Sequence, residues 1–95
     1  MTKKFNLNNP LLFERIKTIS NPARFKILEI VCDRKASVTQ IGKIIGIKYR
    51  RCSEYIRKME KLGLVNKKKD GKEVFVESNI ELKRLSEILE PEAIL

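Results

Sequence analysis

The side chains that could carry chemistry in this 95-residue chain are mostly basic, and they are concentrated in one stretch. Residues 43–72 contain 11 Lys and Arg against 3 Asp and Glu, whereas residues 73–95 contain 2 basic and 6 acidic residues. Clustered Lys and Arg neutralise phosphates and release counterions, which drives binding to a duplex. A generally basic chain with a solvated charged face would not show this contrast. The charge pattern therefore predicts a surface for a nucleic-acid backbone.

Residue types argue against catalysis. The chain has no His, which removes the commonest general base and the commonest metal ligand. Its four Gly match helix ends and hairpin turns and do not form a phosphate-cradling loop. The acidic residues Glu87, Glu90 and Glu92 are interpreted as a solvated face near the C-terminus. We expect neither enzyme activity nor a cofactor.

The basic stretch has the pattern of two helices followed by a β-hairpin. A short apolar helix is expected to end at Gly46, and a longer one is expected over residues 48–62, stopped by a left-handed cap at Gly63. Alternating polarity on both sides of Asp70-Gly71 predicts a basic hairpin over residues 65–77. On the longer helix one face packs and the other is basic. The packing face is formed by Cys52, Tyr55, Ile56 and Met59.

Two helices are expected before this unit. Pro10 suits the first turn of a helix over residues 10–20, and Asn21-Pro22 supplies a cap and a first-turn residue for the next helix. Residues 33–36 are expected to form a polar connector. The expected buried stripe of the second helix consists of Phe25, Leu28, Val31 and Cys32, widened by Ile27 and Ile30. The buried face of the third helix is expected to consist of Ile41, Ile44 and Ile45.

A last helix is predicted over residues 79–90, with Asn79 as its cap and Pro91 as its stop. We expect residues 1–95 to form one domain, which is small enough to gain from association with a second copy. The first and last helices would then form a homodimer interface. Its predicted residues are Leu12, Ile16, Leu82, Leu85, Ile88 and Leu89.

Several short segments carry a recognisable family pattern: residues 20–28 (SNPARFKIL), 38–41 (VTQI), 45–47 (IGI), Ser53 and 59–65 (MEKLGLV), followed by the basic hairpin. In these segments the chain resembles the winged-helix repressors of the ArsR type. It implies a mainly α fold with a small β-hairpin wing (α+β), the winged helix-turn-helix. It also implies binding of double-stranded DNA and a dimer formed by the terminal helices.

The resemblance also bears on how two helices begin. Ser37 with Gln40 fits a capping box for the third helix, but the resemblance favours Thr39 as the cap. The family usually has Ser or Thr ahead of the longer helix, where this chain has Lys48, a change that costs about 1 kcal/mol. Either the exposed N–H groups there bind a DNA phosphate with the Lys48 ammonium, or the first turn frays.

The two cysteines are considered because many ArsR-type repressors sense metals. Neither Cys32 nor Cys52 has a close Cys neighbour in the sequence, and without His no convincing four-ligand set exists. We expect no bound metal. Cys52 occupies a position where the family usually has a buried aliphatic residue, so it is interpreted as a small core hydrophobe. A disulfide or redox switch is the alternative.

The sequence thus predicts a homodimeric, sequence-specific DNA-binding transcription regulator that acts as a repressor. The longer helix would enter the major groove and the wing would lie on the backbone or in the minor groove. Predicted base contacts are Tyr49, Arg50, Arg51, Ser53 and Glu54, although Glu54 could instead pair with Arg50 or Lys58. Predicted backbone and wing contacts are Lys43, Lys48, Arg57, Lys58, Lys67, Lys68, Lys69 and Lys72.

Two other functions fit the same residues. One is an architectural protein that coats DNA with little sequence preference, and the other is a winged helix that binds an acidic protein in a transcription complex. The sequence has no apolar run near 18 residues and no signal-peptide pattern, so we expect a cytoplasmic protein.

Overall fold

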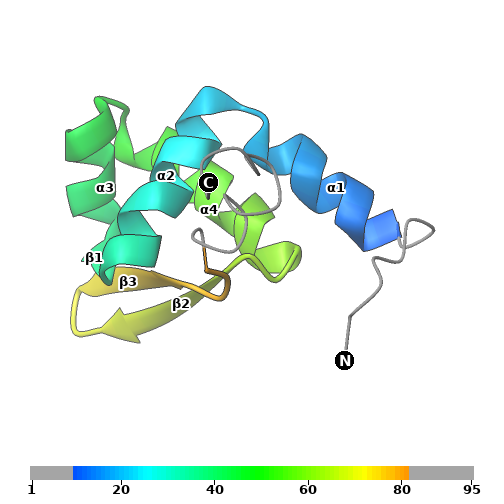
Figure 1. Cartoon of the computed structure of the whole chain (residues 1–95). Helices are drawn as coiled ribbons and strands as arrows, with labels where there is room; N and C mark the ends of the chain where they lie inside the picture. The colour runs from blue at the N-terminus through cyan, green and yellow to red at the C-terminus, as the bar shows by residue number, and fades with distance from the viewer. Residues whose placement is uncertain (1–9, 82–95) are drawn as a thin grey trace, which may run out of the picture.

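The structure is a computed structural model, and it describes residues 10–81. Its helices are α1 (Pro10–Ile19), α2 (Pro22–Asp33), α3 (Val38–Ile45) and α4 (Tyr49–Lys61). Its strands are β1 (Ala36–Ser37), β2 (Val65–Asp70) and β3 (Glu73–Ser78). Helices α2, α3 and α4 contact the sheet, whereas α1 contacts α2 and extends to one side (Figure 1). This is the predicted winged helix-turn-helix; the predicted helix over residues 79–90 lies mostly outside the described residues.

The three strands form an antiparallel sheet in the order β1-β3-β2. Strands β2 and β3 are the predicted hairpin, in register from Val65 opposite Ser78 to Asp70 opposite Glu73. The connecting turn is therefore Gly71-Lys72, one residue later than the predicted Asp70-Gly71, and Gly71 has a φ of 64°. The expected polar connector over residues 33–36 is wrong at its end, because Ala36 is buried and starts β1.

The core lies between the helices and one face of the sheet. Three apolar side chains of α2 are buried in it, Ile27, Leu28 and Val31. The expected burial of Phe25 is wrong, since its side chain lies at the flank of that face and is 37% exposed. Likewise α3 buries Ile41 and leaves Ile44 53% exposed. Each helix therefore buries a narrower stripe than its apolar residues suggested.

Two of the helix starts are capped as the sequence permits. Asn21 accepts a hydrogen bond from the Arg24 amide at 3.1 Å. Helix α3 begins with a capping box in which the Gln40 amide donates to the Ser37 hydroxyl at 3.1 Å and the Ser37 amide donates to Gln40 Oε1 at 2.9 Å. The preference for Thr39 as this cap is wrong, because Thr39 is exposed inside the helix.

The end of β3 is fastened to the junction between α4 and β2. The Asn79 amide donates to the Leu64 carbonyl at 2.9 Å, and Asn79 Nδ2 donates to the Gly63 carbonyl at 3.1 Å. The Asn66 side chain donates to Asn79 Oδ1. Asn79 thus holds the hairpin beside the end of α4; the helix that it was predicted to cap lies outside the described residues.

Candidate nucleic-acid interface

The turn between α3 and α4 fixes the angle of the helix-turn-helix. Gly46 ends α3 with a φ of 75°, and the amides of Gly46 and Ile47 both donate to the Gly42 carbonyl at 2.9 Å. Gly42 is buried, and a Cβ added there would lie 3.1 Å from the Ile47 carbonyl oxygen. The small residue at position 42 therefore lets the turn fold back closely onto α3.

Helix α4 divides into a buried and an exposed face as predicted. Cys52, Ile56 and Met59 are buried, and Tyr55 is half-buried at their edge. Lys48 occupies the cap position with no hydrogen bond from its side chain. The side chains of the first turn are exposed, Tyr49 by 53%. The helix thus presents its N-terminal turn and its polar face outward.

Four of the five predicted base contacts surround one shallow hollow on the exposed face of α4. Its lining residues are Tyr49, Arg50, Ser53, Glu54 and Arg57. Arg50 Nε lies 3.7 Å from Glu54 Oε1, so the predicted pairing of Glu54 with Arg50 is present. Both side chains remain exposed, which makes the ion pair weak enough to exchange for base edges. Such a hollow can accept hydrogen-bonding groups of a base pair.

Arg51, the fifth predicted base contact, lies elsewhere. Its guanidinium carbon is 5.8 Å from the centre of the Tyr55 ring, and the guanidinium carbon of Arg24 in α2 is 5.4 Å from the same ring. The sequence pattern did not indicate Arg24 as a site residue, because α2 was assigned to the core alone. The sequence indicates that Arg24 is the third residue of a capped helix, but it does not indicate how close Arg24 lies to α4.

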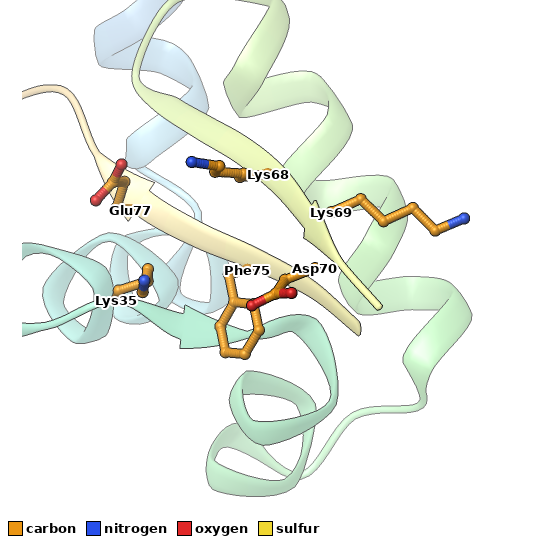
Figure 2. Close-up of a pocket in the computed structure, with 6 residues that line it drawn as sticks. All are labelled: Lys35, Lys68, Lys69, Asp70, Phe75 and Glu77. Carbon is orange, nitrogen blue, oxygen red and sulfur yellow. The ribbon is translucent and has the colours of Figure 1, made fainter. Parts of the chain in front are cut away.

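The wing lysines are divided between the two faces of the hairpin. Because side chains alternate along a strand, Lys67 and Lys69 share a face with buried Val65, while Lys68 lies on the opposite face. Figure 2 shows Lys68 and Lys69 leaving β2 in opposite directions. Lys67 Nζ lies 3.4 Å from Glu60 of α4. The face with Lys67 and Lys69 is therefore the one next to α4.

The outer face of the wing has a hollow of its own (Figure 2). Lys35 Nζ lies 5.5 Å from the centre of the Phe75 ring there, and Glu77 and Asp70 stand beside Lys68. This hollow mixes basic and acidic side chains, as the hollow of α4 does; its charged lining residues are Lys35, Lys68, Lys69, Asp70 and Glu77. The remaining predicted backbone contacts, Lys43, Lys58 and Lys72, are exposed on α3, α4 and the hairpin turn.

The predicted dimer face is described in part. Ile16 is 53% exposed and Leu12 is half-buried on α1, where Phe13 is also 65% exposed. Leu82, Leu85, Ile88 and Leu89 lie outside the described residues. Helix α1 is held to the rest of the fold by polar contacts: Arg15 Nε donates to the Leu62 carbonyl at 2.6 Å.

The two cysteines lie in different surroundings. Cys52 is buried, its thiol donates to the Val38 carbonyl at 3.6 Å, and burial raises its pKa from the ordinary 9.0 to about 11. A neutral, inaccessible thiol is unreactive, which confirms Cys52 as a small core residue. Cys32 is half-buried and donates to Ser78 Oγ at 3.1 Å and to the Ile80 carbonyl at 3.3 Å.

Two kinds of feature are absent from the described part of the chain, clusters of metal-ligating side chains and membrane-spanning helices. Residues 10–81 hold no group of three or more His, Cys, Asp or Glu side chains placed to ligate a metal ion. That the purified protein carries no metal stays a prediction. None of the helices within these residues has the length and apolar character required to cross a membrane.

A helix-turn-helix with an exposed basic second helix and a basic wing beside it defines a winged-helix DNA-binding protein. Residues 21–67 match the family model described as bacterial regulatory protein, arsR family. The chain belongs to this family of winged helix-turn-helix transcription regulators.

Solved structures share this fold. Reduced HlyU from Vibrio cholerae is 26% identical, with 88% of this chain and 90% of that chain covered and a TM-score of 0.75. The transcriptional repressor BigR from Xylella fastidiosa is 23% identical, with 82% and 85% covered and a TM-score of 0.68. The homodimeric winged helix-turn-helix domain of a possible ArsR-family regulator from Mycobacterium bovis is 18% identical, with 98% and 94% covered and a TM-score of 0.73.

Proposed function

We propose that the protein is a homodimeric repressor that binds a discrete site in double-stranded DNA. The observation that carries this proposal is the exposed hollow of α4 with Arg50 and Ser53 in its lining, set beside the basic wing. Arg, Ser and Glu are residues that discriminate base edges in the major groove, whereas clustered Lys binds the backbone without sequence preference. The interface therefore has both a specific and a general part.

Each part of the interface is given a role. Tyr49, Arg50, Ser53 and Glu54 contact base edges, with Arg50 directed at guanine and Glu54 at cytosine once their ion pair opens. The predicted backbone contacts of α3, α4 and the wing, Lys43, Lys48, Arg57, Lys58, Lys67, Lys68, Lys69 and Lys72, hold phosphates or the walls of the minor groove. Among the wing lysines, Lys69 lies on the face of the hairpin next to α4, so we expect it to contribute more to DNA affinity than Lys68 does.

The exposed N-terminus of α4 supports one particular phosphate contact. With no side-chain acceptor from Lys48, the first N–H groups of α4 are available to a phosphate, which the partial positive charge of a helix N-terminus favours. Hydrogen exchange at Tyr49 to Arg51 should slow when DNA is added. Exchange that DNA leaves unchanged would favour a frayed first turn instead.

Dimerisation is proposed from the exposed apolar side chains of α1 together with the sequence of the last helix. Phe13 and Ile16 are each more than half exposed, although apolar, and residues 79–90 supply a second apolar stripe. The M. bovis structure of the same fold is described as homodimeric. The double variant Leu85→Glu, Leu89→Glu should sediment as a monomer, because each substitution places a charge in the apolar dimer interface. A wild type that sediments as a monomer at micromolar concentration would contradict the proposal.

The decisive experiment is selection of bound sites from a random DNA pool, followed by a footprint on the selected duplex. We expect a discrete protected site with two half-sites about one helical turn apart, as a two-fold dimer requires. Uniform protection would favour the architectural protein, and no salt-sensitive binding would favour the protein-interaction module.

Variants then separate the two parts of the interface. Arg50→Ala should cost about 1–3 kcal/mol on the selected site and relax its sequence requirement, with a smaller effect on random DNA. Lys69→Ala should weaken both duplexes equally. Repression is tested by placing the selected site over a promoter and measuring transcription with and without the protein; increased transcription would indicate an activator.

A further inference from the structure

Two arginines and a tyrosine form a cluster on α2 and α4, away from the hollow of α4. Arg51 and Tyr55 are one turn apart on α4, and Arg24 reaches them from the first turn of α2. The two guanidinium carbons lie 5.8 Å and 5.4 Å from the centre of the Tyr55 ring, and hence within about 11 Å of each other. Arg stacks on aromatic rings in this way while its N–H groups remain directed at other partners.

The charges of this cluster are not neutralised within the described residues. Arg50 pairs with Glu54 and Lys67 with Glu60, but no carboxylate of residues 10–81 lies within ion-pairing distance of Arg24 or Arg51. Arg24 uses its Nε to donate to the Thr18 carbonyl at 2.7 Å, which leaves its two terminal amino groups for another acceptor. Two guanidinium groups held near one ring repel each other, and an anion bound close to both would relieve that repulsion.

The cluster lies on the flank of α4 that faces away from the wing. Each residue turns the helix by about 100°, so Tyr55 and Glu60 lie about 220° apart across the exposed side of α4, opposite the side of buried Ile56. Glu60 faces Lys67 of β2, whereas Tyr55 faces Arg24 of α2. A duplex whose major groove receives the exposed side of α4 therefore has one backbone near the wing and the other near this cluster.

We propose that Arg24, Arg51 and Tyr55 form a phosphate clamp that grips the DNA backbone on the side of α4 opposite the wing. In this assignment Arg51 contacts phosphate and not a base edge, and Tyr55 positions the two guanidinium groups. The proposal rests on the proposed function, because it assumes that α4 docks on duplex DNA. It adds a contact from α2, outside the helix-turn-helix and the wing.

The test is the affinity of the full-length protein for the selected duplex and for a random duplex across a salt series. The variants are Arg51→Gln, Arg24→Gln and Arg24→Lys, and the matched control is Arg34→Gln, which removes the same charge from the exposed far end of α2. Arg51→Gln and Arg24→Gln should each lower the affinity for both duplexes by about tenfold, as expected for one lost charged hydrogen bond. Each should also reduce the salt slope by about 0.9. Arg24→Lys should restore the salt slope, and Arg34→Gln should change little.

Several results would overturn the clamp. If Arg51→Gln weakens the selected duplex but leaves random DNA unchanged, Arg51 contacts a base. If both Gln variants change the affinity and the salt slope no more than Arg34→Gln does, the cluster does not contact the DNA backbone, and any loss common to all three variants is general electrostatics. Because Arg24 also fastens the end of α1, a lowered Tm with an unchanged salt slope would assign it a structural role. Each of these results leaves DNA binding by the wild type intact, whereas a wild type that fails to bind duplex DNA overturns the proposed function as well.

Discussion

Replacing Ser37 with Ala should destabilise the protein, because it removes the acceptor for the Gln40 amide at the start of α3. Loss of a Ser cap costs about 0.5–2 kcal/mol. Ser37 is 1% exposed, so water cannot take the place of its hydroxyl, and we expect the upper half of this range, about 1–2 kcal/mol. In a domain of this size that loss corresponds to a fall in Tm of roughly 4–16 °C.

The matched control is Thr39→Ala, which alters the other residue that could have capped α3. Thr39 is exposed inside the helix, so its replacement should change the free energy of unfolding by less than about 0.5 kcal/mol. Urea unfolding followed by circular dichroism measures both variants, at one protein concentration because the proposed dimer would contribute to stability. Equal losses from the two variants, or no loss from Ser37→Ala, would refute the assignment of the capping box.

Three further predictions concern the thiol, the turn and the wing. Because the pKa of Cys52 is raised from 9.0 to about 11, unfolding should become easier as the pH rises through this interval, and Cys52→Ala should reduce that dependence; equal slopes would contradict it. Gly46→Ala should cost about 1–2 kcal/mol in urea unfolding through its φ of 75° alone, since nothing lies within 4 Å of the added Cβ; an unchanged midpoint would show that the turn adapts. Lys69→Ala should reduce the salt slope of DNA binding by about 0.9 and Lys68→Ala by less; equal effects would show that both faces of the wing contact DNA.

Local signals account for the parts of the fold that were predicted correctly. Gly63, the Asn21-Pro22 pair and the two-faced pattern of α4 each act within a few residues, and the structure has each of them as expected. Strand β1 was missed because its two residues form a strand through pairing with Phe75 and Val76, far along the chain. Phe25 and Ile44 were assigned to the core because an apolar residue at helical spacing does not show which side the neighbouring elements cover.

The candidate site likewise has one part that local sequence signals predict and another part that depends on tertiary packing. The hollow of α4 was predictable, because Tyr49, Arg50, Ser53 and Glu54 share one helix and its periodicity places them together. The position of Arg24 beside Tyr55 was not, because it depends on how α2 crosses α4. Strand alternation alone is enough to place Lys67 and Lys69 on one face of the hairpin and Lys68 on the other.

The way in which α1 is attached has a consequence for protein engineering. Arg15 and Arg24 bind backbone carbonyls, those of Leu62 and Thr18, and every residue type supplies a carbonyl. The outward side chains Phe13 and Ile16 take no part in these hydrogen bonds. The outer residues of α1 can therefore be substituted while the attachment of α1 to the DNA-binding unit is retained. For example, one variant of the protein could have positive charges on this surface and a second variant could have negative charges. If the protein dimerises through α1 as proposed, such a pair would form heterodimers that recognise two unlike half-sites, a combination that two identical subunits do not bind.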